Sequence, residues 1–131
     1  MRVLLVDDHP TVRRAYARVL QDEPDMEVVG EAANGMEAIH LTRHLRPDVV
    51  VMDVGMPGMD GIQATRMIHV MLPTVGVIGL SESAEAEQGA AMREAGAVAY
   101  VTKSAPSRSC SGLCGGCTGR VCEQLSPEAA A

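Results

Sequence analysis

Short apolar runs recur at regular intervals along residues 2–101, and stretches with helical spacing separate them. The apolar runs cover residues 2–6, 26–32, 48–52, 75–80 and 97–101. The helical stretches cover residues 10–22, 36–45, 62–72 and 83–95. Buried strands that alternate strictly with helices are typical of right-handed crossovers in a parallel sheet with helices on both faces. We therefore predict an α/β fold with a doubly wound, parallel, five-stranded sheet.

The length of 131 residues allows one compact domain with a short appendage. The chain carries 17 Asp and Glu against 11 Lys and Arg, and an acidic surface of this kind repels a phosphate backbone. No apolar run approaches the roughly 18 residues that cross a bilayer, and no signal peptide is recognisable. We therefore expect a cytoplasmic protein that does not bind a membrane. We also expect no binding of nucleic acid by this chain, because its surface is acidic and the sequence to Ala131 contains no recognisable DNA-binding domain.

Glycine and proline mark the predicted connections. Asn34-Gly35 predicts a turn before the second helical stretch. The residues from Gly55 to Gly61 read GMPGMDG and predict an irregular loop, because three glycines and a proline disfavour regular structure.

Polar residues follow four of the apolar runs at the point where each run ends. They are Asp7 and Asp8, Asp53, Ser81 and Lys103. In a doubly wound sheet, ligands bind beyond the carboxyl ends of the strands, where the strand order reverses. We therefore expect three acids, one hydroxyl and one ammonium group to gather at that edge of the sheet.

Three carboxylates at close range repel one another unless a cation lies between them. Hard oxygen ligands with room for water suit Mg²⁺, which typically takes one or two carboxylates and leaves positions for phosphate oxygens. Lys103 and Ser81 are suited to contact those phosphate oxygens. The predicted chemistry is phosphoryl transfer.

These segments as a set resemble the response regulator receiver domain, and most of all the NarL/FixJ (LuxR-type) subfamily. The matching segments are VLLVDDHP, DVVVMDVGMPGMDG, VIGLS and AGAVAYVTKS, in that order along the chain. The resemblance implies a flavodoxin-like receiver fold over residues 1–104, with an atypical tail over residues 105–131. It also implies a cytoplasmic two-component phosphoprotein with a role in transcription regulation.

The resemblance implies that Asp53 accepts a phosphoryl group from a phosphohistidine on a partner histidine kinase. Asp8, Asp53 and the backbone carbonyl of Gly55 would then ligate Mg²⁺, and Asp7 would reach the ion through water. The chain would be a phosphoacceptor that changes its output surface, and not an enzyme that turns over an external substrate.

The resemblance also assigns the conformational switch. Ser81 and Lys103 would hold the phosphoryl oxygens. Tyr100 would turn inward when Ser81 moves, although a half-buried strand tyrosine without a signalling role is an equal alternative. The readout would be the surface formed by the fourth helix and the fifth strand.

Two other functions remain open at this stage. One is a protein-interaction module that keeps the fold and works without phosphorylation. The other is a phosphatase with an aspartate nucleophile, which is disfavoured because the residue two positions after Asp53 is Gly55 and not a second acid.

Three histidines invite a metal-binding interpretation. His40 and His44 are four residues apart on a predicted helix, where a solvated pair without a third ligand is the better interpretation. His9 either lies near the acidic pocket or is simply a loop residue.

The tail departs from the receiver pattern, since no amphipathic fifth helix follows Lys103 and residues 104–119 are rich in Gly, Ser and Cys. Three explanations compete: a metal site, a flexible tail with redox-active thiols, and a reading-frame slip. The metal site would use Cys110, Cys114, Cys117 and Cys122. A neighbouring reading frame, back-translated with GC-rich codons, gives an amphipathic helical string. Without the helix, an uncovered sheet face predicts self-association.

Overall fold

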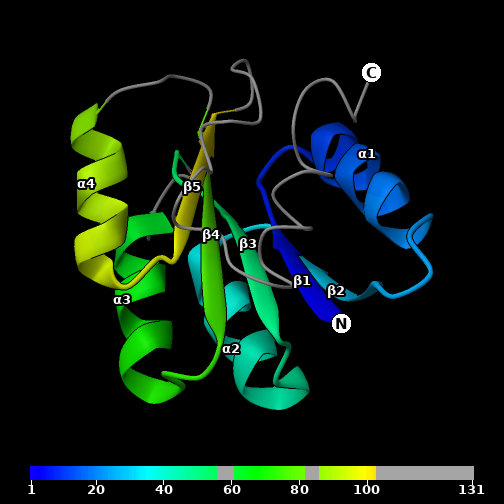
Figure 1. Ribbon diagram of the computed structural model, residues 1–131, viewed down its shortest axis with the longest axis horizontal. Helices are drawn as coiled ribbons and strands as arrows, with labels where there is room; N and C mark the ends of the chain where they lie inside the picture. Colours follow the sequence, from blue (N-terminus) through cyan, green and yellow to red (C-terminus); the bar gives the residue numbers. More distant parts are fainter. Residues whose placement is uncertain (56–60, 82–85, 103–131) are drawn as a thin grey trace.

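The computed structural model describes residues 1–55, 61–81 and 86–102, and only the backbone of residues 81, 86–89 and 100–102 (Figure 1). Strands and helices alternate along these residues. The strands are β1 (Arg2–Val6), β2 (Glu27–Ala32), β3 (Val49–Asp53), β4 (Gly76–Ser81) and β5 (Ala99–Thr102). The helices are α1 (Pro10–Gln21), α2 (Gly35–Leu45), α3 (Gly61–Met71) and α4 (Ala86–Ala95).

The strands form one parallel sheet in the order β2-β1-β3-β4-β5. The chain leaves β1 toward β2 on one side and returns to β3 on the other, so the strand order reverses between β1 and β3. Val6 pairs with Met52 in the register, which places the residues that follow, Asp7 and Asp53, next to each other. The predicted α/β, parallel, doubly wound architecture is therefore confirmed.

Alternate residues of β1 face opposite sides of the sheet and belong to two separate cores. Val3 and Leu5 pack with α1 through Tyr16, Ala17 and Leu20. Leu4 and Val6 belong to the core on the other face, where α2, α3 and α4 lie side by side (Figure 1). That core includes the helical residues Ala38, Ile39, Ala64, Ile68 and Met92. Both faces of the central strands are buried in close-packed cores. The polar residues at the ends of these strands are therefore held on a rigid edge of the sheet.

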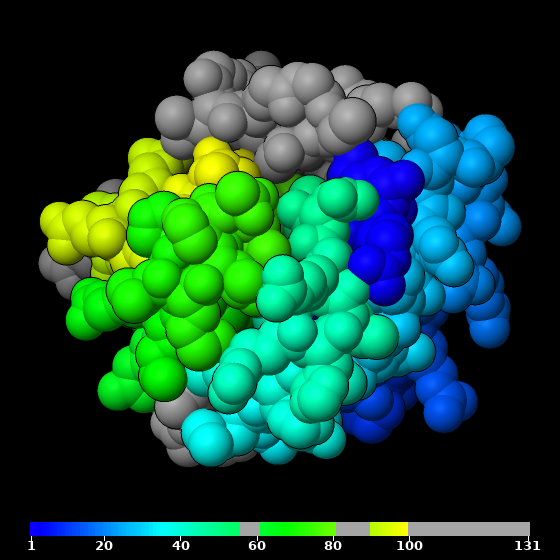
Figure 2. Space-filling view, turned by 90° about the horizontal axis from the view of Figure 1, so that it is seen from below, coloured from blue at the N-terminus to red at the C-terminus, as the bar shows by residue number. Residues whose placement is uncertain are grey.

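The amino ends of the strands lie together at the opposite edge. Figure 2 shows this end, where the N-terminal segment lies against the segment that connects α2 to β3. The backbone amide of Asp48 donates to the Arg2 carbonyl at 2.9 Å, and the Gly76 amide donates to the Asp48 carbonyl at 3.1 Å. These bonds extend the hydrogen-bond ladder by one residue, Asp48, in front of the start of β3.

The structure corrects the predictions for Asn34 and Gly61, and it confirms that Asp53 ends the third strand. Asn34 is not in a free turn but is the N-cap of α2, where its side chain accepts a hydrogen bond from the Glu37 amide at 2.9 Å. Asp53 is the last residue of β3, because its pairing with Leu80 continues the ladder beyond the apolar run. Gly61 is the first residue of α3 and not the last of the loop.

Other predictions lie outside the described residues. These are the start of the fourth helix at residues 83–85, the interior of the loop at 56–60, and everything from Lys103 onward, including the fifth helix and the four cysteines. None of the described helices is both long enough and apolar enough to cross a bilayer.

Candidate phosphoacceptor site

The switch point of the sheet brings three carboxylates together from two neighbouring strands. Asp7 and Asp8 directly follow β1, and Asp53 ends β3. Asp7 is 3% exposed and Asp53 is 4% exposed, whereas a quarter of the Asp8 side chain is exposed. Acids this deeply buried are rare unless they are paired or bind a metal.

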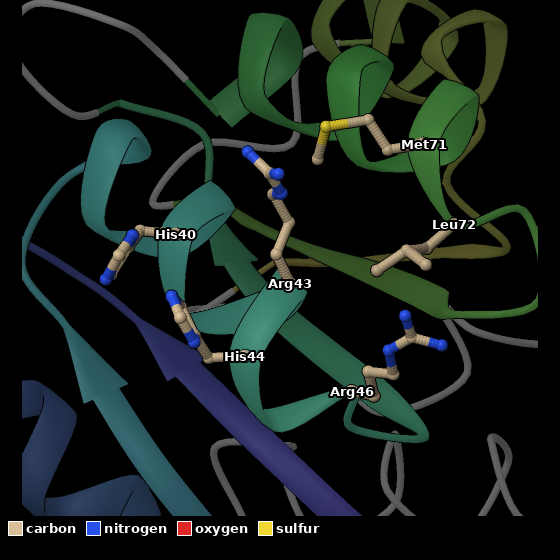
Figure 3. Close-up of a pocket in the computed structure, with 6 residues that line it drawn as sticks. All are labelled: His40, Arg43, His44, Arg46, Met71 and Leu72. Atoms are coloured by element: carbon tan, nitrogen blue, oxygen red, sulfur yellow. The ribbon is translucent and has the colours of Figure 1, made fainter.

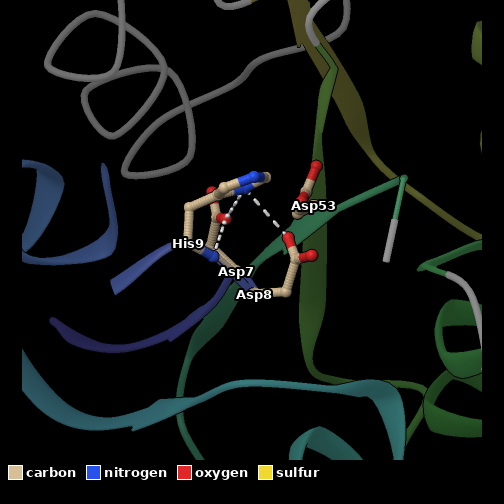
Figure 4. A group of neighbouring side chains, drawn as sticks. All are labelled: Asp7, Asp8, His9 and Asp53. Atoms are coloured by element: carbon tan, nitrogen blue, oxygen red, sulfur yellow. Dashed lines mark hydrogen bonds and ion pairs between the residues drawn. The ribbon is translucent and has the colours of Figure 1, made fainter. Parts of the chain in front are cut away.

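The acids form a compact set with one imidazole. Ligand atoms of Asp7, Asp8, His9 and Asp53 all lie within 4.8 Å of one another, and Figure 4 shows their side chains converging above the ends of β1 and β3. The predicted gathering of Asp7, Asp8 and Asp53 at this edge therefore exists in the structure. His9, which the sequence left between two interpretations, lies in the cluster.

Asp7 is held by contacts from the start of α1. Its Oδ1 accepts a hydrogen bond from the His9 backbone amide at 2.8 Å, and its backbone carbonyl accepts one from the Arg13 guanidinium at 2.6 Å. The same guanidinium pairs with Glu31 of β2 at 2.9 Å. Arg13 thus fixes the end of β1 against both α1 and β2, a positioning role that the sequence analysis missed. An arginine one turn into a helix after Asp-Asp is the pattern that could have indicated it.

Asp8 provides the observation that bears most directly on a metal. Its Oδ1 is buried and accepts no hydrogen bond from the described residues, although it lies 3.0 Å from Nδ1 of His9. That imidazole nitrogen is directed toward Asp7 Oδ1 at 3.2 Å instead. A buried carboxylate oxygen without a donor costs about 1–3 kcal/mol or more, so it calls for a cation. Three clustered carboxylates fit the hard, oxygen-only preference of Mg²⁺.

Asp53 is positioned by a close approach between β3 and α3. The Gly55 amide lies 3.4 Å from Asp53 Oδ1, and the Gly61 amide donates to the Val54 carbonyl at 3.3 Å. A Cβ atom at Gly61 would lie 2.2 Å from the Asp53 carbonyl oxygen, so only glycine permits this packing. The sequence analysis assigned Gly61 to a loop and missed this role.

The remaining predicted residues are placed only in part. Ser81 ends β4, one residue beyond the Leu80 that pairs with Asp53, and it pairs with Thr102 of β5. Tyr100 lies in β5 opposite Gly79. Their side chains and all of Lys103 lie outside the described part of the chain, as does any contact they make with the acids.

A second concave feature lies at the amino edge of the sheet, away from the acids. It is a groove of about 740 Å³ between the ends of α2 and α3, with His40, Arg43, His44, Arg46, Met71 and Leu72 as its lining (Figure 3). The rings of His40 and His44 have centroids 4.3 Å apart. Within the described residues no third metal-ligating side chain joins this pair. The interpretation of a solvated pair stays a prediction.

A parallel sheet in this order defines the flavodoxin-like class of doubly wound α/β proteins, in which ligands bind at the switch point, where the acids of this chain lie. The family of the response regulator receiver domain matches residues 3–110, and the chain belongs to this family. It is therefore a two-component phosphoacceptor domain, and its relatives include transcriptional regulators. Receiver domains bind Mg²⁺ at an acidic pocket and interact with histidine kinases and phosphotransfer partners.

Relatives and solved structures agree on this family. The transcriptional regulatory protein LiaR of Bacillus subtilis is 44% identical over 103 residues, which cover 79% of this chain and 49% of LiaR. A two-component response regulator of the LuxR family from Aurantimonas sp. SI85-9A1 has a TM-score of 0.77 and 42% identity, covering 79% of this chain and 74% of that structure. The chain thus spans about half the length of the first curated relative, at 49%.

Two of the relatives carry an enzymatic name. A protein-glutamate methylesterase/protein-glutamine glutaminase of Myxococcus xanthus is 40% identical over 104 residues, which cover 79% of this chain and only 30% of that protein. The expectation that this chain turns over no external substrate therefore stays a prediction.

Proposed function

We propose that Asp53 accepts a phosphoryl group from a partner histidine kinase in a Mg²⁺-dependent reaction. The observation that supports this most is the convergence of Asp7, Asp8 and Asp53 from two strands, with a buried oxygen of Asp8 that accepts no hydrogen bond from the described residues. Asp53 is the best acceptor of the three, because it ends the central strand β3 beside the exposed Gly55 and the start of α3.

The residues present fit Mg²⁺. Asp8 and Asp53, with the backbone carbonyl of Gly55, would hold the ion, and Asp7 would contact it through water. When bound, Mg²⁺ offsets the negative charge on the transferring phosphoryl group. Asp7 fits the indirect role because its Oδ1 already accepts the His9 amide hydrogen bond.

The transfer itself needs a nucleophile and positioned donors from this chain. A carboxylate oxygen of Asp53 forms a bond to phosphorus while the bond between phosphorus and the kinase imidazole nitrogen breaks, and the bonding pair stays on that nitrogen. The product is an acyl phosphate on Asp53. Lys103 and the Ser81 hydroxyl would hold its oxygens, consistent with the end of β4 lying beside the end of β3.

The switch would then pass from β4 to β5 and α4. Ser81 is the last residue of β4, and Tyr100 is on the adjacent strand, so a movement of Ser81 toward the phosphoryl group is coupled through the sheet to Tyr100. This assignment treats residues 1–104 as the receiver domain. The output, including any control of transcription, would be carried by other parts of a longer protein or by a partner.

The test uses the full chain, Mg²⁺ and acetyl phosphate as a small phosphodonor, with intact mass as the readout. We expect the native chain to gain one phosphoryl group and Asp53→Asn to gain none. Asp48→Asn is the matched control, because Asp48 lies directly before the first residue of β3, at the end opposite to Asp53. The side-chain oxygen of the new asparagine can still accept the hydrogen bond from the Arg2 backbone amide. It should be phosphorylated like the native chain.

Two outcomes would contradict the proposal. Equal phosphorylation of native chain and Asp53→Asn would place the acceptor elsewhere. No mass gain in the native chain, with Mg²⁺ and donor in excess, would favour an interaction module that works without phosphorylation.

A further inference from the structure

His9 occupies a position at which a side chain normally caps a helix, yet it does not cap. It is the N-cap residue of α1, with φ −99° and ψ 104°, and no hydrogen bond runs from its side chain to the helix. Pro10 restricts His9 to this extended conformation. Asn34, the N-cap of α2, does use its side chain to cap. The His9 backbone is thus fixed while its imidazole is left available.

The imidazole is directed at the acids instead. Nδ1 lies 3.2 Å from Oδ1 of Asp7 and 3.0 Å from Oδ1 of Asp8, as the dashed lines in Figure 4 show. One ring nitrogen carries at most one proton and can donate well to only one of these oxygens. The hydrogen-bond geometry favours Asp7, and no donor among the described residues reaches the buried Oδ1 of Asp8.

The shorter of these separations matches that between neighbouring ligands of one metal ion. In an octahedral shell with metal–ligand distances of about 2.1 Å, adjacent ligand atoms lie about 3 Å apart. Nδ1 of His9 and Oδ1 of Asp8 have this spacing, at 3.0 Å, and all ligand atoms of the cluster lie within 4.8 Å of one another. The ring is 58% exposed, so it can shift by the small amount that ligation requires.

We propose that His9 is a direct metal ligand through Nδ1, so that the acidic site prefers first-row transition-metal dications such as Co²⁺ over Mg²⁺ by more than its carboxylates alone provide. Imidazole nitrogen adds affinity for these ions, whereas Mg²⁺ prefers oxygen ligands and retains water. This inference rests on the metal site of the proposed function and adds His9 to Asp8 and Asp53 as a third direct side-chain ligand, which sets the metal preference.

Pulsed electron paramagnetic resonance on the Mn²⁺-loaded full chain tests the nitrogen ligand. The native chain should show hyperfine coupling to an imidazole nitrogen, and His9→Gln should lose it. His44→Gln is the matched control, since His44 lies on α2 in the groove at the opposite edge of the sheet and should leave the coupling unchanged.

Titrations of the same variants test the preference. The cysteines are alkylated first, so that thiols do not compete for Co²⁺. His9→Gln should lower Co²⁺ affinity by about tenfold or more, the range seen when imidazole coordination is disturbed. Its Mg²⁺ affinity should stay within about twofold of the native value, because Mg²⁺ relies on the carboxylates.

The outcomes separate this inference from the proposed function. Bound Mn²⁺ without nitrogen coupling, or an equal loss of Co²⁺ and Mg²⁺ affinity in His9→Gln, overturns the His9 assignment and leaves Asp53 phosphorylation intact. Nitrogen coupling that depends on His9, in a chain that acetyl phosphate does not label, supports His9 and overturns the phosphoacceptor assignment. A native chain that binds neither ion overturns both.

Discussion

The charged side chains at the two edges of the sheet have opposite effects on the stability of the fold. At the amino edge, the Arg2 amide donates to the Asp48 carboxylate at 2.8 Å, and the Arg2 guanidinium donates to the last carbonyls of α2. At the carboxyl edge, Asp7, Asp8 and Asp53 are brought together. Charges at the first edge are matched by partners and stabilise the fold. Like charges at the second edge cost stability, as is common for functional sites.

The packing of backbone differs between the edges as well, and glycine substitution makes that difference measurable. Gly61→Ala should lower the free energy of unfolding by about 3 kcal/mol, because its Cβ atom would lie 2.2 Å from the Asp53 carbonyl oxygen and neither backbone can yield easily. Phosphorylation should fall as well, since the shift displaces Asp53. Urea denaturation and the mass assay measure the two effects.

Gly76→Ala is the counterpart at the amino edge. The nearest atom to its Cβ position would be Val98 Cγ2 at 3.7 Å, an ordinary contact. We expect a change within about 0.5 kcal/mol and normal phosphorylation. Equal losses in the two variants would mean that close packing is not specific to the carboxyl edge.

The positions of the acids could be predicted because they depend only on strand order. Parallel strands end at a common edge, so a run such as RVLLVDD followed later by DVVVMD predicts adjacent carboxylates without any knowledge of side-chain direction. The apolar run at residues 48–52 stops one residue before the end of β3, because Asp is a poor strand former. The pairing of Asp53 with Leu80 outweighs that preference.

The roles of His9 and Gly61 could not be predicted from pattern alone. The direction of the His9 ring depends on the entry angle of α1, and the need for Gly61 depends on how closely α3 approaches β3. Asn34-Gly35 is compatible with both a turn and an N-cap. The choice between them is made by the Glu37 amide and by the Glu37 carboxylate, which accepts from the Ala33 amide at 2.9 Å.

Removal of one acid should reverse the stability balance of the carboxyl edge. Asp8→Asn relieves like-charge repulsion and supplies an amide donor to the neighbouring carboxylates, so we expect a gain of about 1 kcal/mol without metal. The native chain should instead gain about 2.7 kcal/mol when Mg²⁺ is present at 100 times its dissociation constant, and the variant should gain little. Thermal unfolding with and without Mg²⁺ measures both quantities.

Asp48→Asn again provides the control. It removes an acid from the amino edge, where the partner is the Arg2 amide, so its response to Mg²⁺ should equal that of the native chain. If Asp8→Asn were destabilising without metal and still responded fully to Mg²⁺, the acids would be structural and the contrast between the edges would be lost.

A smaller effect than that of Gly61→Ala is expected when a side chain of the amino edge is removed. Arg2→Ala removes the donors to the carbonyls of Leu45 and Arg46, at 2.5 and 3.2 Å, which are among the unpaired carbonyls at the end of α2. Because the bonds are exposed, we expect a loss of only about 1 kcal/mol in urea denaturation. Phosphorylation and the response to Mg²⁺ should be unchanged. Arg14→Ala, on the exposed surface of α1, should change stability by less than about 0.5 kcal/mol. If Arg2→Ala folded normally but failed to accept a phosphoryl group, the two edges of the sheet would be coupled. The charge of Arg2 at the amino edge would then contribute to the phosphoryl transfer as well as to the fold.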